Sequence, residues 1–462
     1  MPRLNLSTLP PLQFWALMVV LMALFLMGGS ARSDVQSLAI LTPATVIFCG
    51  LAFPSFKYEH WNDNKSLLIG FAVFFLIVVF YVVPLPVLPE SFSLATESLR
   101  AIRAVANTTD ASPILSVMPA AAWQSFFFLF APLAVFLLAI QIKRDDLMLT
   151  LPIMIFVGIV SGVIGVLQLA GNSDSPIYLY RISNNGSAVG LFANRNHAAV
   201  FLACLFPILS VFATKLRGTR SGERNISQLV AISVAILLVP LILVTGSRAG
   251  VLAGVIGMVG GVVLYGTQIS TNGRQTNRKF LTPILAASIL LSLVFATIYF
   301  SRAEAINRFF VDPSTGSSRA EFWTSSLNLF WNYFPFGFGP GSFVPAFLNE
   351  EPRSLLSHVY LNRLHNDWLE TAITFGVPGI LLMLGAVAFY VRRSFILWFR
   401  MDGTRSAVAL GRMASVIFAI LGIASMSDYP LRTPAMMGFA ALALIWLKEA
   451  GAACKLTPDN PG

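Results

Sequence analysis

Apolar residues dominate the chain in long runs, and these runs predict its structural elements. Twelve apolar windows, most of them roughly 17 to 24 residues long, match the length that a helix needs to cross a hydrocarbon core about 30 Å thick. The pattern therefore predicts an all-α polytopic membrane protein with about twelve transmembrane helices. The windows fall near residues 12–28, 36–54, 66–84, 125–142, 147–169, 197–214, 227–245, 249–267, 281–300, 367–391, 413–427 and 435–448.

The first window has a second interpretation as a signal peptide, because "MGGSAR" places small residues after an apolar run. We favour an uncleaved first helix, since many further spans follow. The composition agrees with a membrane protein. Of the 462 residues, 56% are hydrophobic and only 11% are charged, whereas about a quarter are charged in soluble domains.

The distribution of Lys and Arg predicts the orientation, because basic residues are retained on the cytoplasmic side. With the N-terminus inside, 19 of the 31 basic residues fall in inner segments and 12 in outer ones. Five of these 12 lie in one long loop at about residues 301–366, and long loops cross the membrane largely regardless of charge. The net charge of +10 therefore reflects topology and requires no nucleic-acid partner.

The spans divide the chain into four expected regions. Helices one to five occupy 1–170, with an outer amphipathic segment at 85–124. Helices six to nine and the outer loops of Arg195 and Arg248 occupy 171–300, the long outer loop 301–366, and helices ten to twelve with an inner tail 367–462. In the first region, apolar residues recur at helical spacing over 94–105, which predicts a helix lying on the outer leaflet. Residues 170–196 are polar and predict irregular chain.

The long outer loop has its own local signals. Ser317 or Ser318 is placed to cap a helix, which Pro335 would end. Asp367 and Glu370 have capping-box spacing for the tenth span, which puts His365 just before that helix. The capped helix is rich in large apolar residues, and glycines that allow sharp turns follow it: Phe322, Trp323, Leu327, Phe330 and Trp331, then Gly337, Gly339 and Gly341.

Cysteine and histidine spacing predicts no metal site. Cys49, Cys204 and Cys454 fall in spans or in the inner tail, and they form no CxxC motif or zinc-like cluster. We therefore expect neither a structural metal nor a cofactor. No convincing internal repeat is visible, which argues against the common secondary-transporter designs.

Arg248 lies in a tight hairpin, "TGSRAG", between two apolar spans. Its side chain could simply extend to lipid headgroups, or its planar guanidinium could bind a substrate phosphate in bidentate fashion. Arg319 could pair with Glu321 or Asp312 at the surface. Several basic side chains on one outer face would, however, attract an anionic headgroup such as a diphosphate.

Two histidines are candidates for proton transfer. His365 in "NRLHNDWLE" is at the outer surface, where it is either a satisfied surface residue or a general base for a hydroxyl. His197, beside Arg195 and Asn196, is the weaker candidate, because these residues could only anchor a helix end.

Several motifs together resemble a known family. "TGSRAGVLAG", "SSRAEFWTSSLNLFWNYFPFGFGPGSF" and "HNDWLETAITFGVPGILL" occur in this order and resemble the signature of the O-antigen ligase and O-antigen polymerase superfamily. "GLFANRNHAAVFLACLFP" resembles the segment that precedes this signature, and "SDYPLRTPAMM" resembles the C-terminal end of polysaccharide polymerases. The resemblance covers roughly residues 190–437.

The resemblance implies an integral membrane glycosyltransferase with a GT-C type fold in the bacterial inner membrane, with its active site facing the periplasm. Its partners would be a glycan donor on undecaprenyl diphosphate, a lipid-linked acceptor and membrane lipids, with no nucleotide sugar or metal. The residues essential in the ligases correspond to Arg248, Arg319 and His365. We also expect a further group to contact substrate: Arg195, Asn196, His197, Arg363, Asn366, Gly339 and Gly341.

The hypothesis is an inverting transfer in which Arg248 and Arg319 hold the diphosphate leaving group. His365 would accept a proton from the acceptor hydroxyl or, if protonated, hold the diphosphate. The acceptor could be lipid A-core, another lipid-linked repeat or a protein hydroxyl, and "DYPLRTP" favours an exopolysaccharide polymerase slightly. Residues 94–105 and the aromatic loop helix could line a groove for the polyprenyl chain. The main alternative from another class is a transporter or a flippase for lipid-linked glycans.

Overall fold

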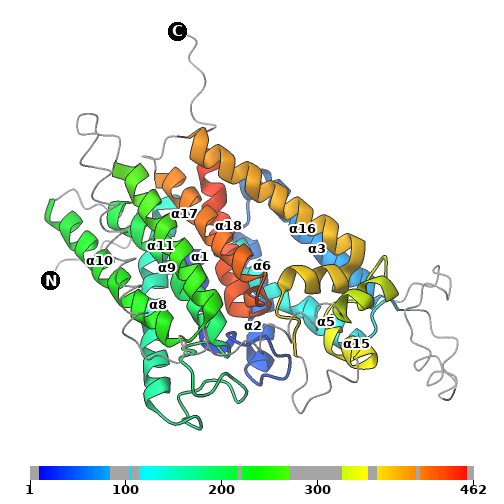
Figure 1. The fold of residues 1–462 in the computed structure, drawn as a ribbon. Coiled ribbons are helices and arrows are strands. Elements are labelled where there is room, and N and C mark those ends of the chain that lie inside the picture. The colour runs from blue at the N-terminus through cyan, green and yellow to red at the C-terminus, as the bar shows by residue number, and fades with distance from the viewer. Residues whose placement is uncertain are drawn as a thin grey trace.

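The fold was obtained as a computed structural model, which describes residues 10–83, 105, 114–215, 221–269, 325–351, 362–401 and 406–454. Within these residues the protein is all-helical and contains no strand (Figure 1). The helices before residue 200 are α1 (Leu12–Met27), α2 (Leu38–Ala52), η2 (Phe53–Ser55), α3 (Tyr58–Val82), α5 (Pro119–Phe128), α6 (Phe130–Ala139), α7 (Arg144–Met148), α8 (Thr150–Ala170) and α9 (Arg195–Lys215). The later ones are α10 (Ser221–Val244), α11 (Arg248–Ile269), α15 (Phe343–Glu350), α16 (Asp367–Phe399), α17 (Ser406–Ala424), η5 (Pro430–Arg432) and α18 (Pro434–Cys454).

The predicted all-α membrane architecture is confirmed. Nine helices in the described residues are long and apolar enough to cross a membrane, and α1 is a shorter apolar helix of 16 residues. The predicted window at 281–300 lies outside the described residues, so the count of twelve stays a prediction. The fourth span begins at Pro119 rather than near residue 125, because α5 continues into α6.

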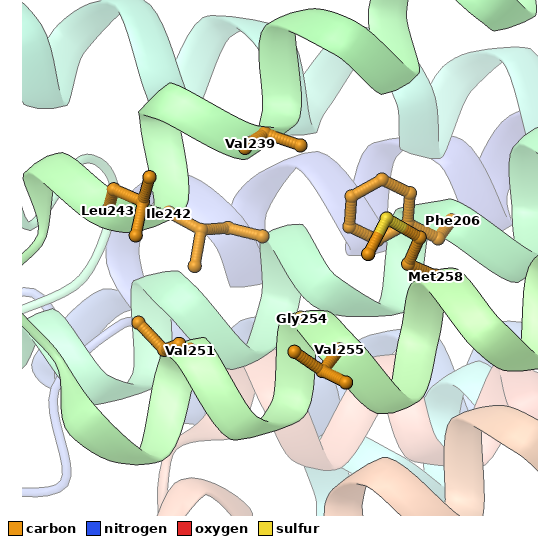
Figure 2. A pocket seen from close by; sticks show the side chains of 8 residues that line it. All are labelled: Phe206, Val239, Ile242, Leu243, Val251, Gly254, Val255 and Met258. Carbon is orange, nitrogen blue, oxygen red and sulfur yellow. The ribbon is translucent and has the colours of Figure 1, made fainter. Parts of the chain in front are cut away.

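Helix α9 lies at the centre of the largest packed group, and 89% of its apolar window is buried. Small residues allow α11 to approach it closely: a Cβ added at Gly257 would lie 2.3 Å from the Ala203 carbonyl oxygen. Between α9, α10 and α11 remains a cavity of ≈ 20 Å³ lined by side chains such as Phe206, Ile242 and Met258 (Figure 2). That volume is about one water, so this region is packed core rather than a substrate site.

Among the described residues, parts of four segments predicted to lie on the outer side are found together at one end of the bundle, near residues 29–31, 180, 363–365 and 428. There Arg363 Nη2 donates to the Ala31 carbonyl oxygen at 3.3 Å, and Gly29 N donates to the Tyr180 hydroxyl at 2.6 Å. At the opposite end Arg393 Nη2 donates to the Lys448 carbonyl oxygen at 2.7 Å. We call the first of these the site end. Its location on the periplasmic side stays a prediction.

Residues 171–194 are irregular chain, as predicted, and they pack against the site end. Gln168 in α8 fixes the position of this segment, because its Oε1 accepts hydrogen bonds from Val189 N and Gly190 N at 3.1 and 2.8 Å. Two expectations about the outer segments, the amphipathic stretch at 94–105 (Val105 apart) and the helix start at Ser317 or Ser318, lie outside the described residues. The division into four regions also stays a prediction.

The glycine-rich turn after the aromatic helix behaves as its sequence predicts. The helix ends before Pro335, and Gly337, Gly339 and Gly341 have φ of +74°, +90° and +74°, which residues with a Cβ rarely adopt. The chain then forms α15, which the sequence pattern did not predict.

The predicted capping box at the start of α16 is wrong in one respect. The N-cap is Asn366, whose Oδ1 accepts from Leu369 N at 3.0 Å. Asp367 and Glu370 lie in the first turn, buried, and pair with arginines instead. His365 does lie just before the helix. The helix breaks at Gly376, where φ is +55°.

Candidate functional site

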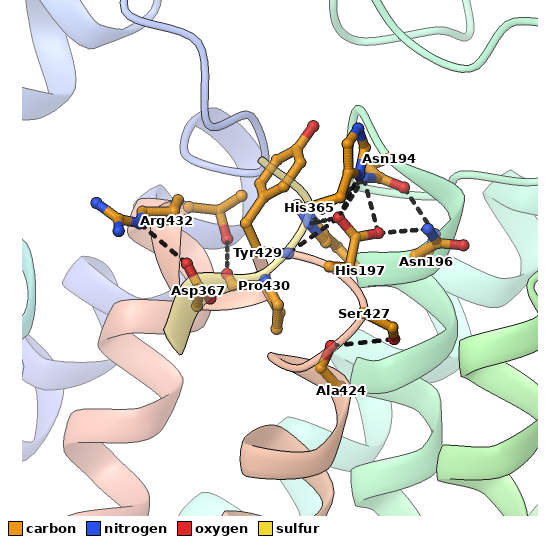
Figure 3. A network of polar contacts seen from close by, with 12 residues as sticks. Asn194, Asn196, His197, His365, Asp367, Ala424, Ser427, Tyr429, Pro430 and Arg432 are labelled. Carbon is orange, nitrogen blue, oxygen red and sulfur yellow. Dashed lines mark hydrogen bonds and ion pairs between the residues drawn. The ribbon is translucent and has the colours of Figure 1, made fainter. Parts of the chain in front are cut away.

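The starts of several helices converge at the site end. Asn194 precedes α9, Gly246 precedes α11, His365 precedes α16, and Asp428 and Arg432 precede α18. Figure 3 shows Asn194, His365 and Arg432 gathered in one network of polar contacts. Because helix starts carry unsatisfied N–H groups and a positive dipole end, this arrangement favours negative charge.

Asp428 is the centre of the cluster, and its side chain is only 1% exposed. Its Oδ2 accepts hydrogen bonds from Asn194 Nδ2 at 3.2 Å and from Asn196 Nδ2. Its Oδ1 accepts from Tyr429 N at 2.9 Å and lies 3.2 Å from His365 Nδ1 and 3.7 Å from His197 Nε2. The carboxylate therefore joins α9 to the segments that precede α16 and α18.

The pKa of Asp428 is held well below its usual range. Burial alone would raise it, but hydrogen bonds and charge interactions with His197 and His365 outweigh burial. The pKa of the neighbouring Tyr429 is raised, first by burial and then by the Asp428 charge. Asp428 is thus ionised at neutral pH and Tyr429 is not, so the carboxylate can accept a hydrogen bond from a histidine N–H.

His365 combines access with backbone strain. Its side chain is 29% exposed, and its φ of +56° makes it the one non-glycine residue with positive φ among the described residues. Such a conformation persists only when the surroundings fix it. Here Leu364 N donates to Glu370 Oε2 at 3.0 Å on one side, and Asn366 caps α16 on the other.

His197 shares the same carboxylate but is 1% exposed, and its ring packs on Tyr429 at 5.0 Å between centroids, as does the ring of His365. Its Nδ1 is buried without a hydrogen-bond partner among the described residues. Burial makes His197 a support of the cluster in this structure, and its expected contact with substrate stays a prediction.

A network of ion pairs lies beside the cluster. Arg432 Nε donates to Asp367 Oδ1 at 2.9 Å, and Arg363 Nη1 donates to Glu370 Oε1 at 2.9 Å. Arg432 Nη2 also lies 3.8 Å from Glu370 Oε1. Since Asp367 N donates to the Ser425 carbonyl oxygen at 2.8 Å, the network ties the start of α16 to the end of α17.

Arg195 and the hairpin of Arg248 lie side by side at the same end. A Cβ added at Gly246 would lie 3.7 Å from Arg195 Nη1, and Ser247 Oγ accepts from Gly250 N at 2.8 Å as the cap of α11. Both arginines are half-buried. Among the described residues Arg195 forms no ion pair with a carboxylate.

Not every predicted residue joins this cluster. Gly339 and Gly341 pack instead on residues 116–121: added Cβ atoms would lie 2.9 Å from Ser116 Cα and 2.5 Å from the Ala121 carbonyl oxygen. Close packing and positive φ account for these glycines, and their contact with substrate stays a prediction. Arg319 lies outside the described residues.

The sequence reasoning missed four members of the cluster: Asn194, Asp428, Tyr429 and Arg432. A usable signal was present, because Asp428 and Arg432 are the charges of "SDYPLRTP" between two apolar spans. Among the described residues no group of three or more His, Cys, Asp or Glu is placed to hold a metal ion. Metal independence stays a prediction.

Comparison with known proteins identifies one region of the chain. Residues 232–384 match the family model described as O-Antigen ligase. The match runs from α10 into α16 and includes the positions of Arg248, Arg319 and His365, whereas Asn194 and Asp428 lie outside it. No curated protein matches the chain.

Proposed function

The chain belongs to the O-antigen ligase family, and on this premise we propose that it transfers a glycan from undecaprenyl diphosphate to a lipid-linked acceptor at the periplasmic face of the bacterial inner membrane. Membership and the apolar helices support a membrane glycan ligase or polymerase. The observation that carries the finer proposal is the accessible, strained His365 held by the ionised Asp428 beside several arginines.

The arrangement supports general-base chemistry at His365. Its Nδ1 faces the Asp428 carboxylate, so Nδ1 carries the proton and the Nε2 lone pair is available to substrate. Asp428 would then hold the ring and stabilise the imidazolium that forms on proton uptake. A base placed in this way contributes about 10²- to 10⁴-fold to rate.

The proposed reaction is an inverting displacement. The acceptor hydroxyl oxygen attacks the anomeric carbon and forms the new glycosidic bond while its proton passes to His365 Nε2. The bond between the anomeric carbon and the diphosphate oxygen breaks, and undecaprenyl diphosphate leaves with the electron pair. Arg248 and Arg319, aided by Arg195, would stabilise the charge that develops on the diphosphate.

A transporter or flippase remains the alternative from another class. Such proteins place ionisable residues near the middle of the membrane and in broken helices. In the described residues the buried carboxylates Asp367, Glu370 and Asp428 all lie at the site end, and the buried Arg412 lies at the opposite end of α16. This distribution favours chemistry at one rim over passage through the bundle.

Reconstitution tests the proposal most directly. The purified protein is given an undecaprenyl-diphosphate-linked glycan with either lipid A-core or a second lipid-linked repeat, which separates ligase from polymerase; a protein acceptor tests the third branch. His365→Asn is the sharpest variant, because Asn tolerates the positive φ that His365 adopts while lacking its base. We expect transfer to fall about 10²-fold or more.

The same assay covers the arginines. Arg248→Ala and Arg319→Ala should also lose transfer while still inserting into the membrane. Near-normal transfer in all three variants, or flipping of lipid-linked glycan in liposomes without any transfer, would contradict the proposal.

A further inference from the structure

The loop helix at residues 325–332, which precedes the glycine-rich turn, buries only one of its two apolar sides. Leu329 and Tyr333 are buried in a local hydrophobic core. Leu327 and Trp331 are four residues apart, so they share another side of the helix, and they are 46% and 69% exposed. A single exposed apolar side chain is ordinary, but several on one side of a helix form a surface that a partner would cover.

Aromatic rings extend this exposed apolar side toward the turn. Phe334 is 49% exposed, and its ring centroid lies 6.0 Å from that of Trp331 and 5.7 Å from that of the half-buried Phe330. We call this surface the aromatic face: Leu327, Phe330, Trp331 and Phe334. The remaining exposed side of the helix is polar and carries Asn328 and Asn332. An exposed apolar side next to an exposed polar side is typical of a helix that lies at the boundary between lipid and water.

The start of α5 shows at which level of the bilayer the loop helix lies. Helices α5 and α6 form one span, Pro119–Ala139, whose 21 residues measure about 31 Å and match the thickness of the hydrocarbon core. The start of this span is therefore at the bilayer surface. The glycine-rich turn packs directly on it, because Val117 N donates to the Phe338 carbonyl oxygen at 3.0 Å. In the same contact, a Cβ added at Gly341 would lie 2.5 Å from the Ala121 carbonyl oxygen.

The break in α16 indicates the same level independently. Two helices meet at a kink at Gly376, and the part after it, residues 377–399, measures about 34 Å and is again the length of one span. The kink is therefore near the bilayer surface. There Val377 N donates to the carbonyl oxygen of Pro335, the residue that follows Phe334, at 2.8 Å. The aromatic face thus lies at the level where lipid headgroups meet the acyl chains.

The surfaces next to the aromatic face are those that lipid would cover. The apolar windows of α3 and α16 are only 17% and 28% buried within the protein. Just after the aromatic face, Phe336 lines an apolar groove together with Val73 of α3 and Leu381 of α16. Near the start of α5, Trp123 is 43% exposed. Since tryptophan is enriched where a membrane meets water, Trp123 and Trp331 mark one interfacial level on neighbouring elements.

We propose that the aromatic face inserts into the lipid bilayer surface at the site end and holds the loop helix on the membrane. The partner is the bulk bilayer, whose boundary combines the apolar and polar surroundings that the two exposed sides of the helix require. Arg319 lies eight residues before Leu327 in the sequence. Anchoring at this level keeps the loop that carries Arg319 close to the headgroups of membrane lipids.

Spin labels in nanodiscs measure the depth of each side of the loop helix. In a protein whose native cysteines are replaced by alanine, Leu327→Cys and Trp331→Cys report the aromatic face, and Asn328→Cys and Asn332→Cys are matched controls on the polar side. Collisions with oxygen, which concentrates in lipid, and with a water-soluble nickel chelate give the depth. We expect the first two labels about 5–10 Å inside the bilayer surface and the controls in water. The nanodiscs contain phosphatidylglycerol and phosphatidylethanolamine but no polyprenyl lipid, so a bound carrier cannot produce the signal.

The native Trp331 gives a second measurement that needs no label. Brominated lipids quench tryptophan fluorescence on contact, and the difference between the natural protein and Trp331→Phe isolates Trp331 among the eight tryptophans. We expect bromines near the headgroup end of the acyl chain to quench this difference signal more strongly than bromines near the chain end.

Three results would overturn the inference. Equal access of the nickel chelate to all four labels would place the aromatic face in water. Protection of the labels at 327 and 331 from both collision partners would assign the face to a protein contact, and spin–spin broadening would identify a second copy of the chain. A Trp331 signal that responds to soluble glycan but not to brominated lipid would make the face a sugar-binding surface. None of these measurements requires transfer, so they test the anchor separately from the proposed reaction.

Discussion

The two ends of α16 both hold a buried or half-buried arginine from a neighbouring segment, but its partners differ. At the start, Arg432 pairs with Asp367 at 2.9 Å and lies near Glu370. At the opposite end, Arg412 of α17 donates from Nε to the Leu397 carbonyl oxygen and from Nη2 to the Met401 carbonyl oxygen, both at 2.8 Å.

This difference between the two ends separates a helix cap from a candidate functional site. Acidic groups at a helix start and a cation at its end both complement the helix dipole, so each arrangement stabilises α16. The polar groups at the far end are accounted for by capping, since Arg412 satisfies carbonyls that the helix leaves free. The start of α16 also has polar groups that capping does not explain. The strained His365, the buried Asp428 and His197 cap no backbone group of α16.

The largest effect is expected from Arg432→Ala, which leaves the buried Asp367 and Glu370 carboxylates short of a cation. Breaking a buried pair in this way costs about 3–5 kcal/mol of stability. Thermal unfolding in detergent measures the loss. The double variant Arg432→Ala/Asp367→Asn should recover much of it, and no recovery would mean that the pair is not what Arg432 contributes.

Asp428→Asn should lower transfer on the order of 100-fold, because a neutral amide lacks the negative charge that stabilises the protonated form of His365. Initial rates over a range of donor concentrations measure this change, and we expect kcat to fall while KM changes little. Ser427→Ala, at the neighbouring position, is the control and should transfer normally. An unchanged kcat in Asp428→Asn would remove Asp428 from the mechanism.

Arg412→Met tests the other end of α16. It removes hydrogen bonds from a charged donor to the carbonyl oxygens of Leu397, Trp398 and Met401. It also removes the packing of the guanidinium on the Trp398 ring, 5.2 Å from the ring centroid. We expect a loss of about 2 kcal/mol in unfolding free energy. Transfer per folded molecule should stay unchanged. A specific loss of transfer would show that the far end also takes part in function.

The smallest effect is expected at Asn366. Removing an N-cap costs about 1 kcal/mol, so Asn366→Ala should lower the thermal stability slightly, whereas Asn366→Asp retains the acceptor and the stability. The pair of variants also separates two roles. If Asn366→Asp keeps its stability but loses transfer, the side chain contacts substrate as the sequence predicts; equal transfer would leave it as a cap alone.

Much of the candidate site was visible in the chain because the motifs are local. "TGSRAG" predicts a tight hairpin, and Gly246 and Ser247 form it with Arg248 at the start of α11. "HNDW" predicts a helix start after His365, and α16 begins there. The cap was assigned to the wrong residue, because Asn366 and Asp367 are both good capping residues and only the tertiary pairing of Asp367 with Arg432 decides between them.

The sequence by itself determined the helical membrane architecture and the positions of most helices, because apolar runs of membrane length have few other stable forms. Only the tertiary structure decided that Asn194 and His365, far apart in the chain, share the buried carboxylate of Asp428. A lone Asp between two spans carries no periodic signal, since its partners depend on which helix starts meet. The packing of α9, α16, α17 and α18 brings them together and turns a single acidic residue into the centre of the site.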